Sequence, residues 1–233
     1  MSNERSSAAV TGSSSGIGLA VAELLLAQGW RVLGLDSAPA VIAHDNFSPV
    51  LVDLGDGAAT EAAALSAAGV DALVHAAGIL RVAPVGELDP ANGELMWRVH
   101  VDAANRLAKA LLPAMKRAGR GRVVLLGSRV ATGIVGRSQY AATKAALASM
   151  ARSWAAEVVA SGVTVNVVSP AATRTAMLGD PARQAAAPRL APIGRLIEPQ
   201  EVASLVAYLL SPAAAAITGQ DIRICGGASL EHG

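Results

Sequence analysis

Short apolar runs alternate with helical stretches along the whole chain, and most of the runs end at Gly, Asp or Ser. The runs predict seven strands, at residues 8–11, 30–35, 49–52, 70–75, 122–126, 163–168 and 221–225. The helical stretches predict helices at 17–28, 57–68, 90–116, 139–160 and 201–210. Strands separated by helices of ten or more residues form a mainly parallel sheet with right-handed crossovers. The pattern therefore predicts an α/β fold: a three-layer, doubly wound arrangement around a mainly parallel seven-stranded sheet.

The charge balance argues against partners that need a strong electrostatic field. Nineteen Lys and Arg face 18 Asp and Glu, which leaves a net charge of +1, so neither nucleic acid nor a membrane is expected as a partner. The hydrophobic share of 52% is ample for a core and excludes intrinsic disorder. No apolar stretch approaches the roughly 18 residues of a membrane helix, and residues 1–7 lack the apolar region of a signal peptide. We therefore expect a cytoplasmic protein.

Cysteine usage and loop composition bound the organisation further. Cys225 is the only cysteine, which excludes an intrachain disulfide and a cysteine-built zinc site, and no metal is expected. We expect residues 1–233 to form one domain. Residues 176–198 are rich in Pro, Ala, Arg and Gly without a clear period, and they predict a short substrate lid.

The turn after the first predicted strand has the composition of a phosphate site. Gly12, Gly16 and Gly18 let backbone approach a pyrophosphate closely, and the helix that begins near Ile17 offers unpaired N–H groups. A dinucleotide fits this turn. Residues 12–16 also spell G-x-S-x-G, the nucleophile turn of α/β-hydrolases, which is the alternative. Against a hydrolase, the turn follows the first strand, and the only late histidine is His232 in the tail.

Asp36 ends the second predicted strand, eighteen residues after Gly18. A carboxylate in this place accepts hydrogen bonds from a ribose diol and repels a 2′-phosphate. No Arg or Lys lies beside Asp36 or in the glycine turn. The sequence therefore predicts NAD rather than NADP as the cofactor. The alternative is that Asp36 serves only as a turn or cap residue.

Tyr140 and Lys144 are four residues apart near the start of a predicted helix, so they share one helical face. A phenol with a pKa of about 10 is a poor base at pH 7, but a nearby ammonium favours the phenolate. Ser128 ends a predicted strand twelve residues earlier and can reach the same cleft. Together they predict an acid/base, its activator and a hydrogen-bond donor to a substrate oxygen.

These motifs, taken together and in order, resemble the short-chain dehydrogenase/reductase family across the whole chain. The resemblance rests on Thr11-Gly12-Ser13-Ser14-Ser15-Gly16-Ile17-Gly18, Ala76-Ala77-Gly78, Ser128, Tyr140-x-x-x-Lys144 and Asn166-x-x-Ser169-Pro170. It implies a Rossmann-type fold and a homotetramer or homodimer. It also implies that Tyr140 is the acid/base, that Ser128 polarises the substrate oxygen, and that Lys144 binds the nicotinamide ribose.

The same resemblance implies the residues that hold the cofactor. Asp53 and Leu54 would meet the adenine, and the Ala76–Gly78 segment would line the adenosine ribose. Thr173 and Thr175, after Pro170, would hold the carboxamide. With the glycine turn and the catalytic pair, the implied cofactor residues are Gly12, Ser14, Ser15, Gly16, Ile17, Gly18, Asp36, Asp53, Leu54, Ala76, Ala77, Gly78, Tyr140, Lys144, Pro170, Thr173 and Thr175.

Two histidines and a shorter loop depart from the family pattern. His100 stands where such proteins usually carry an Asn that supports a proton-relay water, and we predict that a ring nitrogen of His100 binds that water, so that proton transfer responds to pH near 6.5. The alternative is that His100 packs between helices. His75 replaces the usual Asn before Ala76, and its role is interpreted as structural. Arg129 and Arg137 flank the shortened loop and are expected to be solvated, with contact to an acidic substrate group as the alternative.

The resulting hypothesis is an NAD-dependent oxidoreductase that transfers a hydride between nicotinamide and a small-molecule secondary alcohol or ketone, with Tyr140 as acid/base. A secondary alcohol, a cyclic alcohol and a 3-oxoacyl group are all compatible. The substituted His100 motivates a second hypothesis, a non-catalytic NAD-binding protein with a regulatory or assembly role. Retention of Ser128, Tyr140 and Lys144 favours the enzyme.

Overall fold

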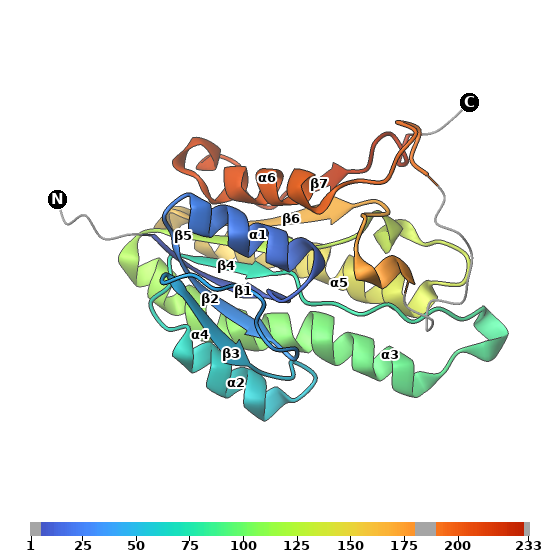
Figure 1. Cartoon of the computed structure of the whole chain (residues 1–233), viewed down its shortest axis with the longest axis horizontal. Helices are drawn as coiled ribbons and strands as arrows, with labels where there is room; N and C mark the ends of the chain where they lie inside the picture. The colour runs from blue at the N-terminus through green and yellow to red at the C-terminus, as the bar shows by residue number, and fades with distance from the viewer. Residues whose placement is uncertain (1–5, 180–189, 231–233) are drawn as a thin grey trace.

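A computed structural model describes residues 6–179 and 190–230 and contains one seven-stranded sheet (Figure 1). Every pair of neighbouring strands is parallel, in the order β3-β2-β1-β4-β5-β6-β7. This confirms the predicted fold class. The strands are β1 (Ser7–Thr11), β2 (Arg31–Asp36), β3 (Phe47–Leu51), β4 (Ala72–His75), β5 (Gly121–Leu126), β6 (Val163–Pro170) and β7 (Asp221–Ile224).

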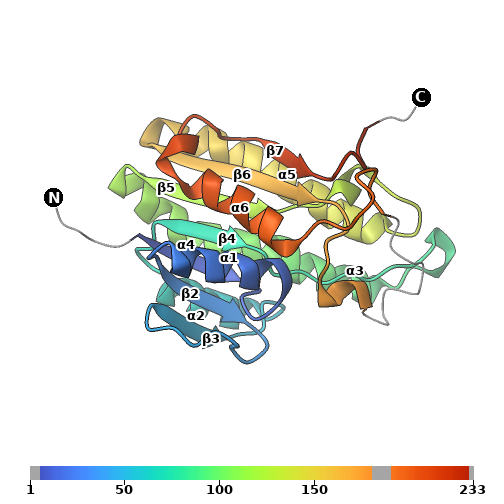
Figure 2. The same ribbon diagram turned by 45° about the horizontal axis from the view of Figure 1, so that its top comes forward.

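Helices cover both faces of the sheet. Helices α1 and α6 lie side by side on one face, and α2, α4 and α5 cover the other (Figures 1 and 2). The helices are α1 (Gly16–Ala27), α2 (Gly57–Ser66), α3 (Pro90–Trp97), α4 (Ala103–Ala118), α5 (Ser138–Val158) and α6 (Pro199–Leu210). Two short 3₁₀ turns, η3 (Arg129–Thr132) and η5 (Ala176–Gly179), lie in the loops after β5 and β6.

Alternate strand residues feed two separate cores. In β1, Ala9 packs toward α4 and α5, whereas Ala8 and Val10 pack toward α1 and α6. Both cores are built from Ala, Val and Leu, and β6 is buried along its whole length. Strands covered on both faces are expected to be mostly apolar, and β6 follows this rule except at the buried polar residues Thr164, Asn166 and Ser169.

The chain changes direction across the sheet between β1 and β4. Thr11 at the end of β1 pairs in register with His75 at the end of β4. At such a switch point the connections leave in opposite directions and open a crevice beyond the carboxyl ends of the strands. The glycine turn, the segment after β4 and the segment after β5 all start at this edge.

The prediction of a single regular helix over residues 90–116 is wrong. Helix α3 ends at Trp97, a π-helical turn η2 spans Arg98–Asp102, and α4 begins at Ala103. The turn holds His100 with no exposed surface. Single π turns inside helices occur frequently at functional sites. Such a turn shifts the helical pattern of side chains by only one residue, so the sequence reads as one continuous helix.

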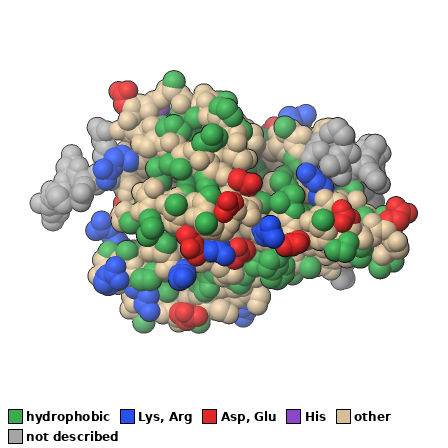
Figure 3. All heavy atoms as spheres, turned by 90° about the horizontal axis from the view of Figure 1, so that it is seen from below, with side chains coloured by type: hydrophobic (Ala, Val, Ile, Leu, Met, Phe, Trp, Pro, Cys, Tyr) green, Lys and Arg blue, Asp and Glu red, His purple; other side chains and the backbone are tan. Residues whose placement is uncertain are grey.

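Charges of both signs are mixed on the face that carries α2, α3 and α4. Figure 3 shows Lys and Arg interspersed with Asp and Glu there, and Arg106 bridges Asp102 and Glu61 on that face. Among residues 6–179 and 190–230, no helix is both long and apolar enough to cross a membrane. Within the same ranges, no group of three His, Cys, Asp or Glu side chains could hold a metal ion.

Candidate active site

The glycine turn joins β1 to α1 with its backbone packed too tightly for larger residues. Gly12 and Gly16 have φ of +69° and +56°, in the left-handed region. A Cβ added to Gly18 would lie 2.1 Å from the carbonyl oxygen of Gly12. The first turn of α1 contains no acidic side chain of its own that would compete for its unpaired N–H groups. This cradle fits a pyrophosphate.

Asp36 lies beside the turn and is bonded to it. One carboxylate oxygen accepts from the backbone N–H of Ser14 at 2.9 Å, and the other accepts from that of Ala38 at 2.9 Å. The carboxylate is therefore oriented at the carboxyl end of β2, with lone pairs left to accept from a ribose diol. The Asp36 carboxylate is also a turn residue, as in the alternative interpretation, because it orders the backbone at Ser14 and Ala38.

The segment after β4 is held by Thr11. Its hydroxyl oxygen accepts from the backbone N–H groups of Ala76 and Ala77, at 3.0 and 2.9 Å. A Cβ added to Gly12 would lie 3.0 Å from Ala77 Cα, so this segment packs directly on the glycine turn. The structure thus brings two predicted cofactor segments together.

Ser128 follows β5 and caps the 3₁₀ turn η3. Its hydroxyl oxygen accepts from the N–H of Val130 at 3.2 Å. An oxygen that accepts from the backbone keeps its own hydrogen for donation. Ser128 is 9% exposed, so that hydrogen is sheltered from bulk water at the edge of the crevice.

Tyr140 and Lys144 lie one turn apart on α5, with the ammonium 5.7 Å from the centre of the phenol ring. Lys144 Nζ donates to the carbonyl oxygen of Leu126 at 2.9 Å, which ties α5 to the strand that leads to Ser128. Only 4% of Lys144 is exposed, and this burial lowers its pKa from 10.5 to about 7. Ser128, Tyr140 and Lys144 therefore come from one corner of the fold, the junction of β5 and α5.

The prediction that His100 binds a relay water is wrong in this structure. Its Nε2 accepts from the backbone N–H of Ile79 at 3.0 Å, and its Nδ1 lies 2.8 Å from the hydroxyl oxygen of Thr143. Both ring nitrogens are therefore occupied by protein groups. Burial, the nearby Lys144 charge and His75 lower the pKa of His100 well below its usual value, so the expected response near pH 6.5 is also wrong. The alternative of packing between helices describes the ring better.

His75 has the predicted structural role. Its Nδ1 lies 3.0 Å from the Thr11 hydroxyl, and its Nε2 lies 3.0 Å from the carbonyl oxygen of His100. Burial is the main cause that lowers its pKa to about 4. His75 thus joins β1 and β4 to the π turn as a neutral ring.

The remaining predicted cofactor residues lie along the same edge. Asp53 follows β3 and accepts from the N–H of Gly55, while Leu54 is buried. Thr173 is 7% exposed and follows β6 after Pro170. A Cβ added to Gly16 would lie 3.2 Å from Thr175 Cγ2, so Thr175 packs directly against the glycine turn. Of the predicted lid, residues 180–189 lie outside the described residues.

The roles of two residues, Arg129 and Thr143, were not expected from the sequence. Arg129 is not simply solvated: it is partly buried and donates to the carbonyl oxygen of Ala228 at 3.2 Å, which holds the segment after β7 against η3. Arg137 is the residue before α5. Thr143 was missed, although its place between Tyr140 and Lys144 in the motif was a signal that could have pointed to it.

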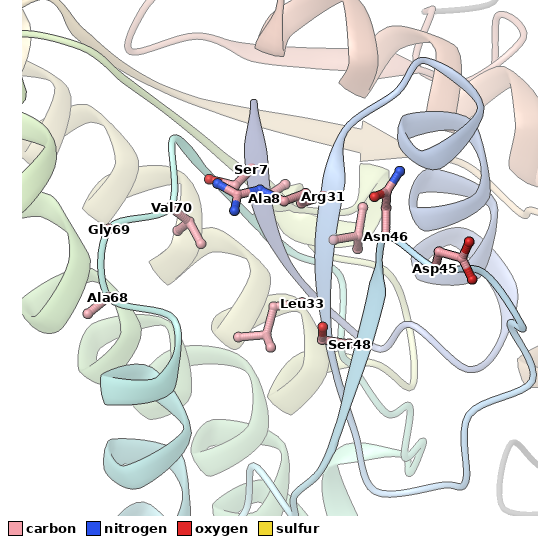
Figure 4. A pocket seen from close by; sticks show the side chains of 11 residues that line it. Ser7, Ala8, Arg31, Leu33, Asp45, Asn46, Ser48, Ala68, Gly69 and Val70 are labelled. Atoms are coloured by element: carbon pink, nitrogen blue, oxygen red, sulfur yellow. The ribbon is translucent and has the colours of Figure 1, made fainter. Parts of the chain in front are cut away.

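A hollow of about 280 Å³ lies at the other end of the sheet. Figure 4 shows it between the starts of β1 and β2 and the loops before β3 and β4. Its lining includes Ser7, Arg31, Asp45 and Ser48, none of which belongs to the predicted site. The predicted site residues therefore lie at the carboxyl edge of the sheet and not in this hollow.

Known proteins similar to this chain belong to the family that its motifs resemble. Residues 12–229 match the family model described as enoyl-(acyl carrier protein) reductase. The chain is 38% identical to 3-oxoacyl-[acyl-carrier-protein] reductase of Vibrio cholerae serotype O1, over 97% of this chain and 98% of the relative. It is 35% identical to galactitol 2-dehydrogenase (L-tagatose-forming) of Cereibacter sphaeroides, over 94% and 93%.

Solved structures agree over the same length. A short chain dehydrogenase/reductase family protein is similar with a TM-score of 0.89 and 37% identity, over 99% of this chain and all of that one. A 3-ketoacyl-(acyl-carrier-protein) reductase from Brucella melitensis, complexed with NADH, has a TM-score of 0.88 and 26% identity, over 97% of this chain and 99% of that one.

Proposed function

The chain belongs to the short-chain dehydrogenase/reductase family, and from this premise we propose that it is an NADH-dependent reductase of 3-oxoacyl thioesters that works through Ser128, Tyr140 and Lys144. Proteins of this family bind a nicotinamide cofactor, and the relatives are named reductases and dehydrogenases. This protein is accordingly an oxidoreductase that acts on CH–OH or C=O groups. The non-catalytic hypothesis loses its motive, because His100 has a packing role that does not remove the catalytic groups.

The observation that carries the proposal is the junction of β5 and α5 beside the glycine turn. Ser128 keeps a hydroxyl hydrogen that can bond to a substrate carbonyl oxygen. The Tyr140 phenol transfers a proton to that oxygen as the carbonyl is reduced, and it takes the proton back in the reverse direction. Lys144 lies 5.7 Å from the ring and favours the phenolate that remains.

NADH, when bound, supplies the hydride that the carbonyl carbon gains. The described residues fit this cofactor: the glycine cradle after β1 for the pyrophosphate, with Asp36 after β2 on one side of it and the Ala76–Gly78 segment after β4 on the other, both for the adenosine ribose. Pro170, Thr173 and Thr175 are proposed to hold the nicotinamide end. The overall reaction balances as 3-oxoacyl thioester, NADH and a proton giving 3-hydroxyacyl thioester and NAD⁺.

An acyl substrate suits the loops that border the crevice. The segment after β4 and the segment after Ser128 are joined by a hydrogen bond from Ala83 N–H to the carbonyl oxygen of Gly136, at 3.0 Å. These two segments expose Val85 and Val135 almost completely, at 86% and 96%. Apolar side chains at the rim offer contact to an acyl chain but no hydrogen bonds to a polyol. The names of the two reductases support the same substrate class.

The test is steady-state reduction of acetoacetyl-coenzyme A, followed by loss of NADH absorbance, with NADPH in parallel. Turnover with NADH at a higher kcat/KM than with NADPH supports the proposal. The reverse assay uses NAD⁺ with secondary alcohols and galactitol. Faster turnover of a polyol than of the thioester would overturn the substrate class and leave the hydride-transfer site standing.

A homodimer or homotetramer in the cytoplasm, formed by one domain over residues 1–233, completes the proposal. The Ala-rich helices α4 and α5 are the surfaces that we propose for subunit contact. Size-exclusion chromatography with light scattering measures the assembly directly.

A further inference from the structure

A series of buried hydrogen bonds links the residue before the glycine turn to the backbone of Tyr140. It starts at Thr11, passes through His75 to the carbonyl oxygen of His100, and continues from the His100 ring to Thr143. The Thr143 hydroxyl then donates to the carbonyl oxygen of Tyr140 at 2.8 Å. Its members before Tyr140 are each 2% exposed or less.

The partners define where every proton lies. Thr11 accepts two backbone N–H groups with its oxygen, so its hydrogen must go to His75 Nδ1. His75 therefore carries its proton on Nε2, which faces the carbonyl oxygen of His100. His100 has the opposite tautomer: Nε2 accepts from Ile79, and Nδ1–H donates to Thr143. Thr143 then has its own hydrogen left for Tyr140. No donor meets a donor anywhere along this series.

His100 contacts both sides of the active site. On one side it holds the Ile79 N–H, which ends the segment that Thr11 holds at Ala76 and Ala77. A Cβ added to Gly78 would lie 3.1 Å from His100 Nε2. On the other side its ring meets the Tyr140 ring edge to face, with centroids 5.6 Å apart and planes at 86°. The ring thus touches the cofactor segment and the phenol together.

We propose that His100 and Thr143 are positioning residues that orient the first turn of α5, and with it the Tyr140 phenol, relative to the cofactor segment at Ala76–Ile79. This inference rests on the proposed function for the role of Tyr140 but not for its geometry. A misplacement of about 1 Å at a reacting group can lower a rate 10²-fold. His100 contacts Ile79 on the cofactor side and Thr143 on the α5 side, whereas Thr143 contacts only His100 and the Tyr140 carbonyl. Substitutions of the two should therefore change different kinetic constants, which a loss of stability alone would not do.

The experiment compares Thr143→Val with Thr143→Ser. The Val variant keeps the shape but removes the bonds to His100 and to the Tyr140 carbonyl, whereas the Ser variant keeps a hydroxyl. We expect Thr143→Val to lower kcat about 10-fold with an unchanged KM and an unchanged Kd for NADH, and Thr143→Ser to stay within about two-fold of the parent. His100→Phe removes the Ile79 bond as well, so it should also raise the Kd for NADH about five-fold, measured by NADH fluorescence.

A second readout does not depend on any substrate. The chain has two tyrosines, so in a Tyr208→Phe background the phenolate absorbance reports Tyr140 alone. We expect the titration midpoint to move in Thr143→Val and not in Thr143→Ser. If Thr143→Val lowers only Tm and leaves kcat and this midpoint unchanged, the positioning role is refuted. If the parent enzyme turns over no ketone or alcohol, the proposed function fails, and the titration and the NADH Kd still decide the positioning role.

Discussion

The two faces of the sheet bury different kinds of side chain. The buried residues of α1 and α6 are all apolar or glycine, among them Leu25 and Leu209. On the other face, the first two turns of α5 bury Thr143 and Lys144, and Thr143 meets the buried ring of His100. An apolar layer is held by area and close packing, whereas buried polar groups are stable only when every partner is present. Both faces have an apolar core, but the second adds these buried polar groups to it. We call the face of α1 and α6 the apolar face and the face of α2, α4 and α5 the chemical face.

Tyr140→Phe tests the chemical face and should have the largest effect, a loss of kcat. Loss of the phenol proton should lower kcat about 10³-fold, because general acid/base catalysis contributes roughly 10²- to 10⁴-fold. The ring and its edge contact with His100 remain, so Tm and NADH binding should stay at parental values. Steady-state kinetics with NADH fluorescence measures both quantities. Tyr208→Phe, on the half-exposed part of α6, is the control and should keep full activity. Parental turnover in Tyr140→Phe would remove Tyr140 from the mechanism.

Acid should lower the stability of the protein through His75, a buried residue of the chemical face. Burial, and after it the charge of Lys144, lowers the pKa of His75 in the folded protein to about 4, against 6.5 for an exposed histidine. Between these values the unfolded chain binds more protons than the folded chain, so stability falls as pH drops from about 6.5 to 4, by about 3 kcal/mol for His75 alone. Urea unfolding at a series of pH values measures the slope.

The matched control for this slope is a histidine on the surface. His75→Asn should flatten the dependence on pH, whereas His44→Asn, at an exposed position, should leave it unchanged. An equal effect of both substitutions would contradict the role of burial.

Leu209→Ala removes packing from the apolar face and leaves the catalytic residues unchanged. Leu209 is 1% exposed between α6 and the sheet, so its truncation should lower the unfolding free energy by about 3 kcal/mol. The kcat of the folded enzyme should stay unchanged. Leu65→Ala, at a position that is 72% exposed on α2, should cost less than about 0.5 kcal/mol. A large drop in kcat below the unfolding transition would show that the two faces are coupled.

Asp36→Asn should give the smallest of these effects. It tests the choice between NADH and NADPH at the end of β2, in the sheet between the two faces. The amide keeps an oxygen that can accept from Ser14 or Ala38 but loses the negative charge that repels a 2′-phosphate. We expect the ratio of kcat/KM for NADPH to that for NADH to rise about 10-fold. The exposed Asp45→Asn serves as the control and should leave the ratio unchanged. An unchanged ratio in Asp36→Asn would refute the assignment of NAD to this carboxylate.

Much of the fold and the places of the site residues could be read from local pattern. The seven strands lie within three residues of their predicted ends, because buried parallel strands are apolar runs bounded by Gly, Asp or Ser. Ser128, Tyr140 and Lys144 could be placed at one corner because residues at carboxyl ends of parallel strands share an edge. The π turn at Arg98–Asp102 was not predicted, because one widened turn shifts the phase of the helical pattern by only one residue.

The role of His100 shows the same limit within the site. The sequence by itself determined the α/β alternation, the glycine turn, the acidic end of β2 and the Tyr-x-x-x-Lys face, since each depends on spacing along one or two adjacent elements. It also placed His100 near the cleft. Only the tertiary structure decided that its nitrogens go to Ile79 and Thr143 and not to water. Those partners lie 21 and 43 residues away, and hydrogen-bond partners at such separations are chosen by packing among several elements, which no local pattern encodes.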